Sequence, residues 1–189
     1  MKLMLLGLLV FLGTHAFTTM RVARAGVVAK IGEASYRVLY SVVSIVGVVM
    51  IGWGFAAWHA EGSPQLWYPP LWTKHLAIAL MLFASICFAA AYPPTHIRIW
   101  LKHPMLVGIK TWAVAHLIAN GDLAGIVLFG TVLAWAVWSR ISMKWRPAPV
   151  YPAPRWVADA VALVGGGVLF VLLAALFHPY VVGLKVLPI

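Results

Sequence analysis

Six long apolar segments, separated by polar and proline-containing connections, dominate the pattern of this 189-residue chain. Each is close to the roughly 20 apolar residues that a helix needs to cross a bilayer. We expect the spans at 3–20, 38–58, 74–92, 104–120, 123–139 and 158–178. The pattern therefore predicts an all-α, polytopic membrane protein of five to six spans, a six-transmembrane-helix bundle that forms a single domain over residues 1–189.

The composition excludes several other classes of protein. Hydrophobic residues make up 63% of the chain and charged residues 10%, whereas a soluble domain carries about 25% charged residues. A soluble enzyme and a disordered chain are excluded on that ground. Cys87 is the single cysteine, so an intrachain disulfide is excluded as well.

The net charge of +10 comes from 14 Lys and Arg residues against four acids. In a soluble protein this balance would indicate nucleic-acid binding. Here the bases lie between apolar segments, where the positive-inside bias and anionic lipid headgroups explain them. We therefore expect the lipid bilayer as a partner, and no nucleic acid.

The distribution of the bases also predicts an orientation. If six helices alternate, ten bases share one side: Arg21, Arg24, Lys30, Arg37, Arg98, Lys102, Arg140, Lys144, Arg146 and Arg155. The other side holds Lys2, Lys74, Lys185, Glu61 and Asp122. This asymmetry makes the ten-base side cytoplasmic and places both termini on the periplasmic side. The basic stretch 21–37, with apolar residues interspersed, is expected to lie along the membrane surface.

Seven histidines are the chemically informative residues of so apolar a chain. We interpret His59, His96 and His178 as polar residues of connections and helix ends. The other four, His15, His75, His103 and His116, lie within spans or at their starts. An ionisable group inside a membrane span is by default a hypothesis for a functional site.

The spans offer histidines but few carboxylates, and this set of side chains favours a haem iron over hydrolytic or acid–base catalysis. The chain has no His-Glu-x-x-His, Gly-x-Ser-x-Gly or paired Cys-x-x-Cys motif, and its four carboxylates are too few for paired acid–base work. A haem needs only an apolar cleft and one or two imidazole ligands. The alternative is that these histidines form hydrogen bonds between helices.

Helix geometry restricts which histidines share one iron. His103 and His116 are separated by roughly 20 Å along one helix and cannot do so. His15 and His116 differ in depth by roughly 10–12 Å, so His75 with His116 is the easier match in level.

Polar residues near His116 allow two interpretations each. Asn120-Gly121 predicts a turn with positive φ, and Asp122 is expected to cap the next helix. Alternatively, Asn120 or Asp122 orients the His116 imidazole. Lys110 either extends toward the membrane surface or binds an acidic group such as a haem propionate.

Several stretches resemble the NnrU family of membrane proteins. They are Leu12-Gly-Thr-His15, Gly32-Glu-Ala-Ser-Tyr-Arg-Val-Leu-Tyr-Ser-Val-Val-Ser44, His103-Pro-Met-Leu-Val-Gly108, Ala115-His-Leu-Ile-Ala-Asn-Gly-Asp-Leu123 and Leu128-Phe-Gly. The resemblance runs from residue 1 to about 185 and implies a multi-pass protein of the bacterial inner membrane. It also implies a link to nitrite and nitric oxide metabolism in denitrification.

NnrU proteins are in turn similar to the plant zeta-carotene isomerase, a haem b enzyme. That similarity implies haem b as cofactor and His15 and His116 as the iron ligands. It thus favours His15 over His75 as the partner of His116. From the residues themselves, Lys110 and Asn120 are further candidates for cofactor binding, and His75 and His103 are alternate ligands. The isomerase is thought to exchange an axial histidine for a cysteine; the corresponding position here is Ala113, which argues against such a switch.

Three functions follow as hypotheses. The first is a haem-dependent redox enzyme or cis–trans isomerase of an apolar polyene or quinone-like substrate. The second is a membrane cytochrome for electron transfer or nitric oxide sensing. The third is a haem-free assembly factor, in which the histidines only connect helices.

Overall fold

Every apolar segment that we expected to cross the membrane is helical in the computed structural model, which describes residues 1–145, 150–183 and 186. These helices are α1 (Lys2–Phe17), α3 (Glu33–Ala60), α4 (Leu71–Ala89), α6 (Pro104–Ala119), α7 (Leu123–Ser142) and α8 (Trp156–Leu172). The remaining elements are α2 (Arg21–Ile31), α5 (His96–Leu101), the short 3₁₀ turn η1 (Met143–Trp145) and the π-helix η2 (Leu173–Val182), which continues α8. Arg146 and Lys185, two bases of the predicted charge asymmetry, lie outside the described residues.

Four of the helical segments are long and apolar enough to cross a membrane: Glu33–Ala60, Leu71–Ala89, Leu123–Trp145 and Trp156–Val182. A fifth is added if α1 and α2, which meet at a bend of 90°, count as one broken span. Helices α1 and α6 have 16 residues each, which gives about 24 Å at about 1.5 Å per residue. That is shorter than the hydrocarbon core of about 30 Å. The all-α membrane class is confirmed.

The described chain divides into two compact units. Unit 1 comprises Met1–Trp67 and Asp122–Trp145, and therefore holds α1, α2, α3 and α7. Unit 2 comprises Tyr68–Gly121 and Arg146–Ile189, with α4, α5, α6, α8 and η2.

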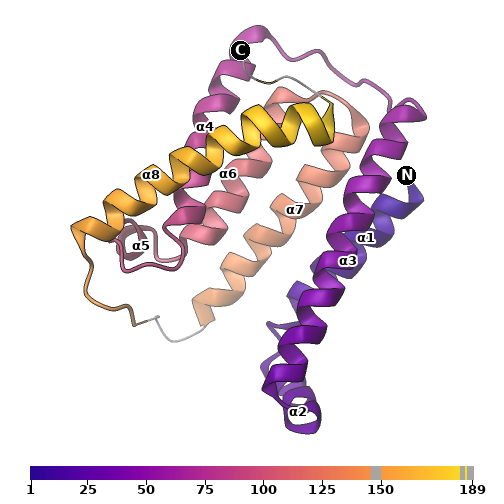
Figure 1. The fold of residues 1–189 in the computed structure, drawn as a ribbon. Helices are drawn as coiled ribbons and strands as arrows, with labels where there is room; N and C mark the ends of the chain where they lie inside the picture. Colours follow the sequence, from indigo (N-terminus) through magenta and orange to yellow (C-terminus); the bar gives the residue numbers. More distant parts are fainter. Residues whose placement is uncertain (146–149, 184–185, 187–189) are drawn as a thin grey trace. The chain divides into compact units, whose positions relative to one another are not determined.

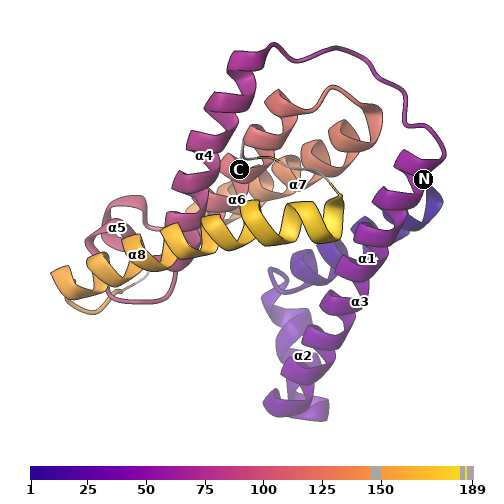
Figure 2. The same cartoon turned by 45° about the horizontal axis from the view of Figure 1, so that its top comes forward.

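In unit 1, α1 runs beside α3, as both ribbon views show (Figures 1 and 2). Small residues permit this close approach, because a Cβ on Gly54 would lie 2.2 Å from the Met4 backbone nitrogen and one on Gly7 would lie 2.7 Å from that of Ile51. Small residues at helix contacts are typical of membrane proteins, in which van der Waals packing replaces the hydrophobic effect between helices.

Helix α2 leaves the α1–α3 pair and is joined to α3 by one residue. Gly32 takes φ +83°, a backbone conformation that L side chains rarely adopt, and donates its N–H to the Val28 carbonyl at 2.8 Å. None of the residues of α2 is buried. The location of the basic stretch 21–37 along the membrane surface stays a prediction.

Unit 2 is built on α4, against which α6 and α8 pack. A Cβ on Gly108 of α6 would lie 2.6 Å from the Phe88 ring, and one on Gly166 of α8 would lie 2.5 Å from the Ile86 Cα atom. Glycines therefore let both helices approach α4 closely, and α8 crosses α4 obliquely in both views (Figures 1 and 2).

Candidate functional site

His15 lies in the last turn of α1, where its ring is fixed by its own helix. The Nδ1–H donates to the Phe11 carbonyl one turn earlier at 2.8 Å, and the Phe11 ring lies 4.2 Å from the imidazole, centroid to centroid. A carbonyl only accepts, so this bond assigns the proton to Nδ1 and the lone pair of the neutral ring to Nε2. Within the described chain, no hydrogen bond or ion pair reaches Nε2 of His15.

Two further aromatic rings surround His15 from other helices of unit 1. Tyr40 of α3 lies 5.3 Å away and Trp135 of α7 lies 5.7 Å away, with the Trp135 ring edge-on at 88°. An oriented imidazole with an aromatic surround is therefore assembled from α1, α3 and α7.

Buried polar atoms without a hydrogen-bond partner gather in the same part of unit 1. The described residues contain four such side-chain atoms: Tyr36 Oη, Ser44 Oγ, Ser85 Oγ and Trp135 Nε1. Trp135 contacts His15, and Tyr36 and Ser44 lie four residues on either side of Tyr40, on the face of α3 that Tyr40 presents to His15. An unsatisfied buried donor costs about 1–3 kcal/mol, so these three side chains make the surroundings of His15 a candidate binding site.

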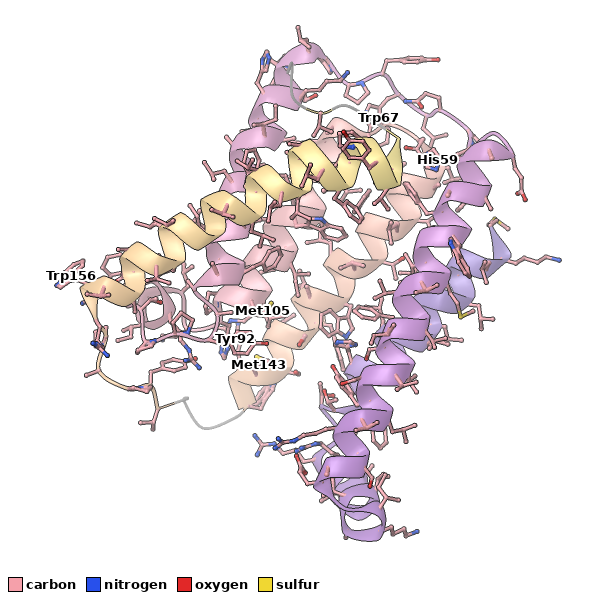
Figure 3. All side chains as sticks on the ribbon, in the orientation of Figure 1. His59, Trp67, Tyr92, Met105, Met143 and Trp156 are labelled. Carbon is pink, nitrogen blue, oxygen red and sulfur yellow. The ribbon has the colours of Figure 1, made fainter. Side chains whose placement is uncertain are left out.

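His59, labelled at the end of α3 in Figure 3, repeats the local geometry of His15. Its Nδ1–H donates to the Phe55 carbonyl at 3.1 Å, and the Phe55 ring lies 4.3 Å away. Its Nε2, however, lies 3.1 Å from Oδ1 of Asp122. The sequence placed His59 in a connection, but α3 extends to Ala60 and includes it.

Asp122 is the N-cap of α7, as predicted. Its Oδ1 accepts from the Gly125 N–H at 2.9 Å and from the Ser63 hydroxyl at 3.1 Å, beside its contact with His59. The positive φ predicted at Asn120-Gly121 is wrong: Asn120 is extended with φ −121°, and Gly121 is not among the positive-φ glycines. The chain stays extended there because the Leu123 N–H donates to the Pro64 carbonyl at 2.9 Å.

In unit 2, His116 near the end of α6 lies beside His178 of η2. The ring centroids are 6.2 Å apart and the planes are 17° from parallel. The Nδ1–H of His116 donates to the Trp112 carbonyl at 2.8 Å, and that of His178 to the Leu173 carbonyl at 2.7 Å. Both bonds assign the lone pair of the neutral ring to Nε2. Sequence reasoning missed this pair because it assigned His178 to a helix end.

The other predicted site residues lie as follows. The Asn120 amide donates to the His116 backbone carbonyl at 2.8 Å, so it caps α6, and Trp112 is the residue that orients the His116 ring. Lys110 is half-buried on α6, His75 is exposed on α4, and His103 is the N-cap residue of α6. Cofactor binding by these residues stays a prediction.

A second histidine of unit 2 that sequence reasoning left at the membrane interface has a buried partner. Nδ1 of His96 lies 2.5 Å from Oδ2 of Asp159, a residue only 8% exposed, and the His96 backbone N–H donates to Oδ1 at 2.9 Å. The Trp156 ring, labelled at the start of α8 in Figure 3, stacks on His96 at 4.0 Å. Asp159 therefore connects α5 to α8. The sequence offered one signal for this pair: Asp159 is one of only four acids, and such an acid in an apolar chain needs a partner such as a histidine.

Among the described residues, no three or more His, Cys, Asp or Glu side chains lie close enough together to hold a bare metal ion. Haem differs from a bare ion in needing only one or two protein ligands.

The helices and their oriented histidines define a polytopic α-helical membrane protein. The chain belongs to the NnrU family, because the family described as "NnrU protein" matches residues 3–186, nearly the whole chain. Neither the curated proteins nor the solved structures that were compared with it gave a match.

Proposed function

We propose that this NnrU-family protein is a membrane haem b protein of nitrite and nitric oxide metabolism, with His15 as an iron ligand. The observation that carries the proposal is the surround of His15: an Nε2 lone pair without a partner in the described chain, aromatic rings on two sides and three buried donors without acceptors.

The residues around His15 fit a haem in their chemistry. A porphyrin has two apolar faces, for which Phe11, Tyr40 and Trp135 offer aromatic contacts, and its carboxylates accept hydrogen bonds. The bond from Nδ1 of His15 to the Phe11 carbonyl is the kind of support that metal-ligating histidines use to fix their orientation. When bound, the haem would supply redox chemistry, and displacement of one histidine would open a site for diatomic gases.

The second ligand is His116 in this proposal, as the resemblance implies, and His178 is its rival. The ring of His178 lies 6.2 Å from that of His116, centroid to centroid. This neighbour makes His178 the alternative to His15 as the partner of His116.

The absorption spectrum of protein purified in mild detergent from haem-replete cells tests this proposal. The wild type is expected to show a Soret band, and His15→Ala and His116→Ala are expected to lose it. Two variants serve as controls. His59→Ala removes a ring with the same local geometry but an occupied Nε2, and His75→Ala removes an exposed histidine; both are expected to keep the band. A wild type without a Soret band contradicts haem binding and favours the assembly factor.

His178→Ala distinguishes the two ligand pairs. If His15 and His116 hold the iron, His178→Ala keeps the low-spin spectrum of two imidazole ligands. Loss of that spectrum in His178→Ala, together with its retention in His15→Ala, would assign the iron to unit 2.

Two activities are proposed for the bound haem. The first is redox or isomerase chemistry on an apolar polyene or quinone-like substrate that reaches the site from the lipid. Incubation of the reduced protein in membranes with a cis-carotenoid tests it, and unchanged isomer ratios in both redox states would exclude isomerisation. The second is electron transfer or nitric oxide sensing, for which titration with the gas decides: an unchanged haem spectrum excludes sensing.

A further inference from the structure

An open pocket lies where α2 folds back against the start of α3, within unit 1. Its volume is about 480 Å³, and its walls include Arg24 of α2 and Tyr36, Arg37 and Tyr40 of α3. The turn at Gly32 produces the pocket, since it returns α2 toward α3 and brings Arg24 beside the first turn of that helix.

Two guanidinium groups in this pocket share a single acid. Arg24 Nη2 lies 3.2 Å and Arg37 Nε 3.0 Å from the same oxygen, Oε1 of Glu33. Two positive charges against one negative charge leave the pocket with a net charge of +1. Because a guanidinium carries five N–H donors, most donors of both arginines remain for another acceptor.

Tyr36, which lines the pocket, also carries a buried donor. Tyr36 is 7% exposed, and its hydroxyl has no hydrogen-bond partner in the described chain. Its ring is held by Arg24, whose guanidinium carbon lies 5.2 Å from the ring centroid. A buried phenol that lacks an acceptor, beside two arginines with unused donors, is a site for an oxyanion such as a carboxylate or a phosphate.

The pocket shares two residues with the surroundings of His15. Tyr40 lines the pocket and also lies 5.3 Å from the His15 ring. Thr18 lines the pocket too, and its hydroxyl donates to the His15 carbonyl at 2.7 Å. A ligand that spans both places would combine an apolar, iron-bearing body with an anionic edge.

We propose that the pocket of Arg24, Tyr36 and Arg37 binds the propionate carboxylates of the haem whose iron is held by His15. This inference rests on the proposed function. The pocket is open and its arginines are partly exposed, 42% for the Arg24 side chain and 75% for that of Arg37. The carboxylates would therefore stay at the polar edge of the site while the porphyrin enters its aromatic part.

Titration of the apo-protein with haem b and with haem dimethyl ester, in phosphatidylcholine nanodiscs, tests the proposal by the Soret band. The ester lacks the two negative charges but keeps the iron and the ring. The wild type is expected to bind haem b about tenfold more tightly than the ester, a difference of about 1.4 kcal/mol. Arg37→Gln is expected to bring that ratio close to one.

Tyr36→Phe is the conservative variant, since it keeps the ring that packs against Arg24 and removes only the hydroxyl. It is expected to lower the affinity for haem b several-fold, with little effect on the ester and with an unchanged Soret position. Arg21→Gln is the matched control: Arg21 is an exposed arginine of the same helix that does not line the pocket, and its variant is expected to keep the wild-type ratio.

The outcomes separate this inference from the proposed function. If the wild type binds both porphyrins equally well, the propionate site is overturned and haem binding stands. If the wild type binds neither, both fail. Equal affinities for the porphyrins, together with phosphatidylglycerol binding that Arg37→Gln weakens, would overturn the proposal and assign the pocket to a lipid phosphate.

Discussion

His15 and His59 lie at two ends of unit 1. Each ring makes the same contacts within its own helix, but the side chains that the neighbouring helices bring to it differ. Each ring donates its Nδ1–H to the carbonyl of a phenylalanine four residues earlier, and each packs on that phenylalanine at 4.2 and 4.3 Å. At the His59 end, the carboxylate of Asp122 occupies Nε2. At the His15 end, Nε2 faces no partner in the described chain, and buried donors of other helices lack acceptors.

The comparison shows that the Phe-x-x-x-His spacing orients an imidazole without deciding its role. The spacing is a property of one helix, because residues four apart share a face. The role depends on what the neighbouring helices bring to the second ring nitrogen. Asp122 makes His59 part of a structural connection between α3 and α7, whereas the buried donors near His15 have no acceptor in the described chain.

The largest expected effect is on stability, and it comes from the close packing of α1 against α3, the two helices that carry His15 and His59. Gly54→Ala puts a Cβ 2.2 Å from the Met4 backbone nitrogen, so the helices must separate. We expect a loss of about 3 kcal/mol in the free energy of unfolding. Gly52→Ala, at a glycine of the same helix with open space around it, is expected to gain roughly 0.5–1 kcal/mol. Thermal unfolding in detergent measures both, and equal stabilities would contradict the close contact.

Removal of the Asp122 carboxylate tests the structural role of the His59 end. Asp122→Ala loses the cap of α7 and the acceptor for His59 and Ser63. We expect about 2 kcal/mol lower stability and an unchanged haem content. Asp122→Asn keeps a good capping residue and is expected to lose about half as much. A lower haem content per folded chain in Asp122→Ala would show that the two ends do not have separate roles.

A smaller change in stability, expected to differ in sign between the apo-protein and the haem-loaded protein, tests the role of the buried donors near His15 that lack acceptors. Ser44→Ala removes a buried hydroxyl without a partner, so the apo-protein is expected to gain about 1 kcal/mol of stability. The haem-loaded protein is expected to lose stability if that hydroxyl serves the ligand, and Trp135→Phe is expected to behave in the same way. The control is Ser142→Ala, because the Ser142 hydroxyl already donates to the Ser139 carbonyl at 2.8 Å. A shift of the same sign in both states would remove these donors from the site.

The sequence predicted the helices better than the contacts between them. Apolar segment length located six helices, of which four are long enough to cross a membrane, or five with the bent α1–α2 pair. The Asp122 cap was predictable because its partner, the Gly125 N–H, lies three residues away. The bend of 90° between α1 and α2 was not predicted from the sequence.

The missed features depend on pairs that are distant in the chain. The His96–Asp159 bond joins residues 63 apart, and His178 reaches His116 across a similar distance, through a helix that widens into a π-helix around Pro179. Hydropathy identifies each segment but carries no information on which faces meet. The buried donors near His15 were likewise invisible, since burial of Ser44 and Trp135 depends on how α1, α3 and α7 pack.

Imidazole rescue of His15→Gly tests directly whether His15 binds the haem iron. The substitution removes the ring at the end of α1 and leaves room for free imidazole. We predict that the Soret band of the purified protein is lost in His15→Gly and returns when imidazole is added with haem b, while His59→Gly keeps the band throughout. Retention of the complete wild-type spectrum by His15→Gly without imidazole would show that His15 is not an iron ligand.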